Sequence, residues 1–378
     1  MVCRLCGARV DRRHHKLGAH YRGISIEVMY GAMLCLGVGS LMLRRAQTRP
    51  WAIAIASLVI AAAIGFGIVN GANDAANSIA TVIGTRNLAP RTALAMAAGC
   101  EFLGAATGTA VAKTIGRGII EPDALTIGIV LAGVLAIIVW GVGATSRGFP
   151  ISLTHGLVAG LVGAGLSYNG ASIINWRVLG RVFSAVGIAP LLGLTGGFAL
   201  MLAILWVFRS TKPAAVRTVF SKLEVASAAF LAYSHGKNDG QMPIALMTMG
   251  VVTAGGATEF DIPVWAILVS ASAISLGTLI GGWRVIRTVG MRMTALRPSA
   301  GFAAETSAAT IIEIASHLGI PVSTTHCVSS AIMGVGATRR ASAVRWSIAQ
   351  RIVVTWVVTF PACGFLGWVF GLLFQYVA

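Results

Sequence analysis

Two short polar motifs each occur twice in the chain, in the same order, and both carry side chains that can bind ions. Gly71–Asp74 (GAND) recurs as Gly236–Asp239 (GKND), and Pro150–His155 (PISLTH) recurs as Pro321–His326 (PVSTTH). Two unrelated motifs repeated in one order predict an internal duplication. In membrane transporters built this way, each repeat contributes half of a central site.

The Asn-Asp pairs lie inside apolar stretches, where an isolated acid is costly. An Asp at the centre of a membrane helix costs roughly 2.5 kcal/mol or more, so Asp74 and Asp239 each need a cation, a proton or a hydrogen-bond donor. The amide oxygens of Asn73 and Asn238 add the hard oxygen ligands that sodium prefers, and we expect a break in the helix after each Asp to free backbone carbonyls. Capping of a helix N-terminus is the alternative role for each Asp.

Hydroxyl side chains begin both of the segments that follow the prolines. The N–H groups and the positive dipole end of a helix N-terminus favour an anion. Added hydroxyls would make a cradle of neutral donors, which releases an anion more readily than an Arg fork does. Helix capping is the alternative, but it does not explain the His shared by both copies. The candidate anion-binding residues are Ser152, Thr154, Ser323, Thr324 and Thr325.

Several other titratable residues lie in apolar stretches. His155 and His326 directly follow the hydroxyls, so we expect them to orient the turn, with proton coupling as the second possibility. Glu101 and Glu305 do not correspond under the repeat, and could be coupling acids, gates or partners of hydroxyl groups. Glu313 is the weakest candidate of this kind. His235 has no counterpart in the first copy, and the sequence assigns it no role.

Composition indicates the kind of protein that must position these residues. The 378 residues are 56% hydrophobic and 11% charged, and apolar stretches long enough to cross a bilayer recur throughout the chain. The net charge of +17 gathers in short connectors, as the positive-inside rule describes, and no basic stretch alternates with aromatic residues as nucleic-acid binding would require. We therefore predict an all-α, multi-pass protein of the plasma membrane with ten to twelve transmembrane helices.

The same signals divide the chain. Residues 1–50 are a basic extension with a possible extra helix, 51–208 the first repeat, 209–222 a basic cytoplasmic linker and 223–378 the second repeat. Two short, Gly-rich segments, 152–167 and 322–338, start just after a Pro and predict re-entrant hairpins, which survive at membrane depth only when they are buried in protein or line a wet cavity. The segmentation does not decide whether the repeats are inverted.

The stretch NGANDAANS (Asn70–Ser78), together with PISLTH and PVSTTH, resembles the paired signatures of the inorganic phosphate transporter family, over about residues 52–378. That family includes sodium-phosphate cotransporters. The resemblance implies two inverted repeats with paired hairpins, frequent dimers, no cofactor, and movement of phosphate with sodium or protons. It places the hydroxyl residues around phosphate and the Asn-Asp residues around the cation.

The second copy departs from the family pattern. Met242 stands where the first copy has Asn77, which leaves Gln241 as a substitute cation ligand, and Lys237 is close enough to help hold the anion. The coupling-cation residues that we predict are therefore Asn73, Asp74, Asn77, Asn238, Asp239 and Gln241.

The functional prediction is a secondary active phosphate transporter, a homodimer that couples to Na⁺ or H⁺ by alternating access. A sulfate permease on the same scaffold is the nearest alternative; a shared proton would relieve the repulsion between phosphate and a carboxylate, whereas sulfate has no proton to share. A channel would need a continuous polar pore. An enzyme is not expected, because the sequence shows no set of nucleophile, base and orienting residue.

Overall fold

The computed structural model describes residues 50–255 and 260–375, so the predicted extension at 1–50 lies almost wholly outside the described residues. In the described ranges the chain is helical, with one isolated bridge between Ile120 and Ile174 in place of any strand. The α-helices are α2 (Pro50–Gly84), α3 (Pro90–Ala105), α4 (Ala110–Gly118), α5 (Ile127–Arg147), α6 (Leu153–Asn169), α7 (Trp176–Val207), α8 (Pro213–Asp239), α9 (Gln241–Thr253), α10 (Val264–Ile280), α11 (Trp283–Arg287), α12 (Pro298–His317), α13 (Thr324–Ala337) and α14 (Trp346–Phe374). Short 3₁₀ turns occupy Pro122–Ala124, Gly170–Ile173 and Ala341–Ala343, and a π-turn follows α11 at Thr288–Arg292.

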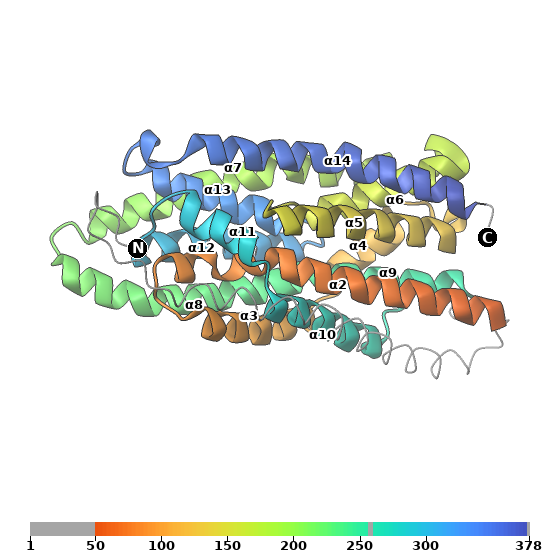
Figure 1. The fold of residues 1–378 in the computed structure, drawn as a ribbon, viewed down its shortest axis with the longest axis horizontal. Coiled ribbons are helices and arrows are strands. Elements are labelled where there is room, and N and C mark those ends of the chain that lie inside the picture. The colour runs from red at the N-terminus through yellow and green to blue at the C-terminus, as the bar shows by residue number, and fades with distance from the viewer. Residues whose placement is uncertain (1–49, 256–259, 376–378) are drawn as a thin grey trace, which may run out of the picture.

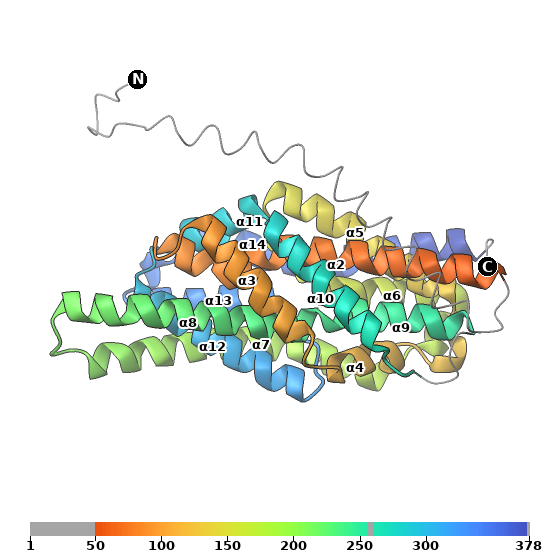
Figure 2. The ribbon, with the colours of Figure 1, turned by 90° about the horizontal axis from the view of Figure 1, so that it is seen from below.

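The helix boundaries follow from local chemistry. Pro90, Pro213 and Pro298 occupy the first positions of α3, α8 and α12, where a missing N–H costs nothing. Thr126 and Asn175 cap α5 and α7 through their side chains. Most of the long helices run along one axis of the molecule, while α3 and α10 cross it obliquely (Figures 1 and 2).

Four described helices, α2 from Ala56 onward, α5, α7 and α14, are long and apolar enough to cross a membrane. Two bent pairs, α3 with α4 at 65° and α10 with the α11 segment at 62°, raise the number to six if each pair is one span. That number is below the predicted ten to twelve, because α8 and α12 are long enough to span but more polar, and the remaining described helices are shorter than a span. The all-helical, multi-pass architecture itself is confirmed.

Helices from the two predicted halves pack across one another in matching pairs. α2 packs on α10 as α8 packs on α3, and α6 packs on α14 as α13 packs on α7. Glycines allow the close crossings: a Cβ on Gly71 would lie 2.0 Å from the backbone oxygen of Ile274, and one on Gly236 would lie 2.2 Å from that of Glu101. The glycine of each GxND motif therefore serves helix packing, and the inverted relation of the halves stays a prediction.

The short arms form helical hairpins with the helices before them, α5 with α6 and α12 with α13. α6 and α13 begin at Leu153 and Thr324, close to the predicted arm starts. The basic stretch 209–222 includes a short connector and the first turns of α8, which starts at Pro213. In both views this connector lies at the left end of the molecule (Figures 1 and 2).

Candidate functional site

The two hairpin tips contact each other in the protein interior through reciprocal hydrogen bonds. Thr325 Oγ1 donates to the carbonyl oxygen of Ile151 at 2.9 Å, and Thr154 Oγ1 donates to that of Val322 at 3.4 Å. All of these residues are buried. Each hairpin therefore holds the tip of the other, and the predicted anion-binding hydroxyls meet at one place.

The two serines cap the hairpin helices. Ser152 Oγ accepts the N–H of His155 at 3.2 Å, and Ser323 Oγ accepts the N–H of His326 at the same distance. The capping alternative is therefore correct for both serines, although a hydroxyl that accepts one bond can still donate its proton to an anion. Other N–H groups in the first turn of a helix have no partner within the helix.

The rings of His155 and His326 are buried and form no hydrogen bond to any described residue. Their centroids lie 5.0 Å apart in an edge-to-face arrangement, with His155 stacked on Phe360 and His326 against Trp356. The ring nitrogens therefore do not orient the turns by hydrogen bonding; the backbone N–H groups of the same residues do so through the serine caps.

Asp74 and Asp239 reach the hairpin tip from α2 and α8. Thr324 Oγ1 lies between them, 3.2 Å from Asp74 Oδ2 and 3.4 Å from Asp239 Oδ2. Thr325 Oγ1 lies 3.1 Å from Asp74 Oδ1, and Asn77 Nδ2 donates to Thr325 Oγ1 at 3.0 Å. Both predicted motifs thus meet at one buried place, although α2 continues unbroken to Gly84 and the predicted break after Asp74 is wrong. In the second copy, α8 ends at Asp239 and α9 starts at Gln241.

Each Asn of the Asn-Asp pairs bonds to a hairpin. Asn73 Nδ2 donates to Thr145 Oγ1 at 2.7 Å, and Asn238 Nδ2 donates to the carbonyl of Val322 at 2.9 Å. On α2 the amide oxygens of Asn70, Asn73 and Asn77 are buried without a hydrogen-bond partner among the described residues. Three unpartnered oxygens beside a carboxylate, along one face of a helix, are free to bind a cation.

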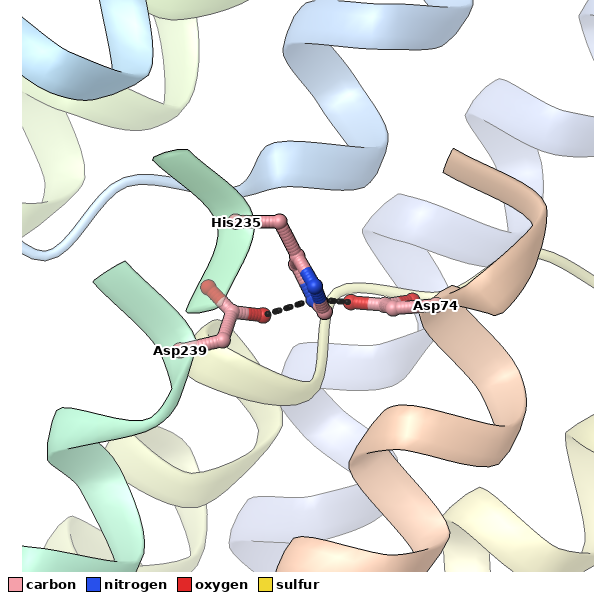
Figure 3. Close-up of side chains that lie close together, drawn as sticks. All are labelled: Asp74, His235 and Asp239. Atoms are coloured by element: carbon pink, nitrogen blue, oxygen red, sulfur yellow. Dashed lines mark ion pairs between the residues drawn. The ribbon is translucent and has the colours of Figure 1, made fainter. Parts of the chain in front are cut away.

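His235 lies at the centre of the carboxylates (Figure 3), although the sequence assigned it no role. Its Nε2 is 3.3 Å from Asp239 Oδ2 and 3.7 Å from Asp74 Oδ2, and its Nδ1 is 2.9 Å from Glu101 Oε1. The four residues are at most 1% exposed. The available signal was its position four residues before Asp239, one helical turn away on the same face of α8.

The ligand atoms of Asp74, His235 and Asp239 all lie within 4.8 Å of one another, close enough to share one ion. Three carboxylates surround this imidazole, and among the described residues no Lys or Arg pairs with any of them. Buried negative charge without counter-charge is strongly disfavoured. The cluster therefore needs added positive charge.

The two predicted coupling acids both bind hydroxyl groups. Glu101 accepts from Ser78 Oγ at 3.1 Å and from Thr278, besides its contact with His235. Glu305 accepts from Thr81 and Ser227. Of the roles that the sequence left open, the partner of hydroxyl groups is the one that the geometry shows for both acids.

Two residues predicted near the ions have other partners. The ammonium of Lys237 pairs with Glu313, and both side chains are partly exposed. The amide oxygen of Gln241 accepts the N–H of Ala112 at 3.1 Å, in the first turn of α4. In this structure, therefore, neither group is directed at the carboxylate cluster.

Comparison with known proteins gives concordant matches. The sequence profile of the "Phosphate transporter family" matches residues 70–367. A "Probable low-affinity inorganic phosphate transporter" of Rhizobium meliloti (strain 1021) is 42% identical over 310 residues, covering 82% of this chain and 93% of that protein. A protein of the same description from Bacillus subtilis (strain 168) is 37% identical over 313 residues, covering 82% and 94%. A solved structure titled "The sodium-dependent phosphate transporter" superposes with a TM-score of 0.78 at 26% identity, covering 86% of this chain and all of that one.

Proposed function

Because the chain belongs to the phosphate transporter family, a family of permeases and not of enzymes, we propose that it couples phosphate movement across the plasma membrane to a cation by symport. The observation that carries this proposal is the buried group of Asp74, Asp239 and Glu101 around His235, without Lys or Arg among its described partners. A phosphate arriving at the adjacent hairpin tips adds more negative charge. Cations that bind together with the phosphate would neutralise its charge and the charge of the carboxylates.

Sodium is the cation that the ligand set favours. Carboxylate oxygens of Asp74 and Asp239 and the unpartnered amide oxygens of Asn73 and Asn77 are hard oxygen ligands. Asn238 and Gln241 stay weaker candidates, since their amide oxygens already accept hydrogen bonds from Ser316 and Ala112. The solved structural neighbour is described as sodium-dependent. A proton is the alternative cation, and His235 together with Glu101, or Glu305, would carry it.

We place phosphate at the hairpin tips. Ser152, Thr154, Ser323, Thr324 and Thr325 lie at two helix N-termini that meet there, and helix N-termini favour anions. Phosphate would take over the hydroxyl donors that now serve Asp74, Asp239 and the opposite tip, while the cations compensate the carboxylates. A sulfate permease is disfavoured by the family and by the relatives, which are named for phosphate.

The contacts between the hairpin tips support alternating access as the mechanism. The bonds from Thr154 to Val322 and from Thr325 to Ile151 join the two hairpins. Separating one hairpin at a time would open the site to one side and then to the other. Homodimer formation, which the resemblance implies, enters no step of this mechanism.

Uptake of radiolabelled phosphate into proteoliposomes tests the proposal. An inward sodium gradient should drive uptake above the level without a gradient, whereas a pH gradient alone should not, and excess unlabelled sulfate should leave uptake unchanged. Uptake driven only by the pH gradient would assign the proton instead. Equal uptake under all conditions would refute coupling, and strong inhibition by sulfate would favour the permease alternative.

A further inference from the structure

An apolar groove runs between α7 and α12 on the outside of the helix bundle. It has a volume of about 290 Å³, and α7 lines it from Arg181 to Leu192. These positions are eleven residues apart, which at 1.5 Å per residue is a length of roughly 16 Å. The hydrocarbon layer of a bilayer is about 30 Å thick, so the groove has the depth of one leaflet.

The walls of the groove are apolar and open to the surroundings. Ile188 of α7 and Ile314 of α12 are each more than half exposed, as is Leu318 just beyond α12. α7 is one of the helices long enough to span the membrane, and only 28% of its most apolar window is buried in the protein. These walls therefore face lipid chains.

A positive charge marks one end of the groove. Arg181 lines it and is exposed, and no acidic side chain pairs with Arg181 among the residues that the structure describes. The start of α7 carries the exposed Trp176, and Trp side chains favour the membrane interface. Arg181 lies little more than one helical turn further along α7, at the headgroup level of the leaflet away from the predicted cytoplasmic connector 209–222, where its guanidinium can bind the phosphate of an anionic lipid.

Two residues that line the groove lie beside the proposed phosphate site. Ile320 and Val322 line the groove and precede α13. The carbonyl oxygen of Val322 accepts the hydrogen bonds from Asn238 and from Thr154 of the opposite hairpin. A molecule that fills the groove would therefore contact the segment that bonds to an Asn-Asp motif and to the opposite hairpin tip.

We propose that this groove binds one anionic phospholipid, with an acyl chain between α7 and α12 and its phosphate at Arg181, and that the bound lipid supports the segment before α13. The positive charge of Arg181 matches the lipid phosphate and the apolar walls match an acyl chain. The length of the groove matches the depth of one leaflet. A zwitterionic lipid supplies the chain but presents no net negative charge to Arg181.

Lipid retention by the purified protein tests the binding. In native mass spectrometry we expect one molecule of phosphatidylglycerol to be retained in preference to phosphatidylcholine. Arg181→Gln should lower the apparent affinity for phosphatidylglycerol about fivefold, the value of one basic residue at an anionic surface. Arg217→Gln, at an exposed Arg of α8 that does not line this groove, is the matched control and should leave the affinity unchanged.

A substitution that fills the groove gives a second, independent test of the binding. Ile188→Trp should abolish preferential retention of phosphatidylglycerol, whereas Leu191→Trp, at an exposed neighbour outside the groove, should not. Equal retention of both lipids by the unaltered protein would overturn the proposal. So would a change of oligomeric state in Ile188→Trp with lipid retention intact, because a second copy of the chain would then cover the groove.

The functional consequence is measured in vesicles of defined composition. Phosphate uptake should be higher in phosphatidylglycerol vesicles than in phosphatidylcholine vesicles, and Arg181→Gln should remove most of that difference. A lipid preference that persists in full in Arg181→Gln would contradict the proposal. Because retention is measured without transport, its failure would leave the proposed symport untouched, and failure of coupled uptake would leave the lipid site untouched.

Discussion

The two halves of the site differ in charge although they agree in packing. His235 precedes Asp239 by four residues, and the corresponding position before Asp74 is Asn70. Glu101 packs its backbone against Gly236, and the residue that packs in the same way against Gly71 is the apolar Ile274. The bonded pair of Glu101 and His235, where α3 crosses α8, therefore has no equivalent where α2 crosses α10, since the buried side chain of Asn70 has no hydrogen-bond partner among the described residues.

The hairpin contacts keep the two-fold pattern that the charges lack. Thr154 and Thr325 donate to the opposite tips, and Ser152 and Ser323 cap their helices identically. This comparison indicates that the duplication determines the helix packing and the hydroxyl groups of the proposed anion site. Of the two equivalent helix crossings, that of α3 and α8 carries the pair of Glu101 and His235, whereas that of α2 and α10 has Ile274 and Asn70 at these positions, so equivalent substitutions in the two crossings should have unequal effects.

The largest effect is expected at the shared carboxylates. Asp239→Asn and Asp74→Asn should each lower coupled phosphate uptake about thirtyfold or more, since losing one member of a buried, hydrogen-bonded charged pair costs about 2–5 kcal/mol. Uptake should be measured in proteoliposomes at matched protein levels, with membrane insertion checked separately. Normal uptake in both variants would exclude these residues from coupling.

The second prediction tests the difference in charged residues between the two copies of the motif. His235→Asn, which copies the first half, should lower uptake about tenfold, because it removes hydrogen bonds to charged groups worth about 1.5–3 kcal/mol. Asn70→Ala is the matched variant: it removes one neutral amide oxygen of the candidate cation ligands and no side-chain hydrogen bond to any described residue, so uptake should fall less, by about threefold. Equal losses in the two variants would show that the halves contribute alike.

The third prediction tests the shared packing. Gly71→Ala and Gly236→Ala should both destabilise the fold by about 1–3 kcal/mol or more, since each added Cβ would meet backbone oxygen in a well-packed crossing. Thermal unfolding of the purified variants measures this. Gly99→Ala is the control: its Cβ would contact nothing within 4 Å, so stability should be unchanged or slightly higher. A stable Gly236→Ala would argue against the close crossing of α3 and α8.

The smallest effect is expected at the hairpin tips. Thr325→Val should impair uptake more than Thr154→Val does, because the Thr325 hydroxyl donates to Ile151 or Asp74 and accepts from Asn77, whereas Thr154 makes one longer bond to Val322. Each lost bond is worth about 1 kcal/mol. Uptake assays on the two single variants and the double variant give the comparison, and a larger loss in Thr154→Val would reverse it.

Much of the site could be predicted from the sequence because the duplication marks it. The doubled motifs pointed to Asp74, Asp239 and the hydroxyls of the hairpins, and the structure brings these residues together. Prolines and glycines indicated where α6 and α13 begin. Their roles in binding phosphate and cations stay predictions that the assays above address.

What the sequence missed depends on contacts between distant elements. The place of His235 in the site was not predicted, because the residue has no counterpart in the first copy of the motif. Its partner Glu101 lies on α3, more than 130 residues earlier, and reaches it through a close helix crossing that Gly236 permits. The unbroken α2 could not be foreseen either: Asp74 sits within a continuous helix, where partners on α8 and α13 compensate for its burial.

Simultaneous measurement of radiolabelled sodium and phosphate influx into proteoliposomes, for the unaltered protein and for Asp239→Asn, tests the central claim most directly. The account predicts that sodium enters with phosphate in a fixed ratio, that each flux requires the other ion, and that Asp239→Asn loses both together. Phosphate influx that proceeds at the full rate in Asp239→Asn, or in the complete absence of sodium and of a pH gradient, would contradict it.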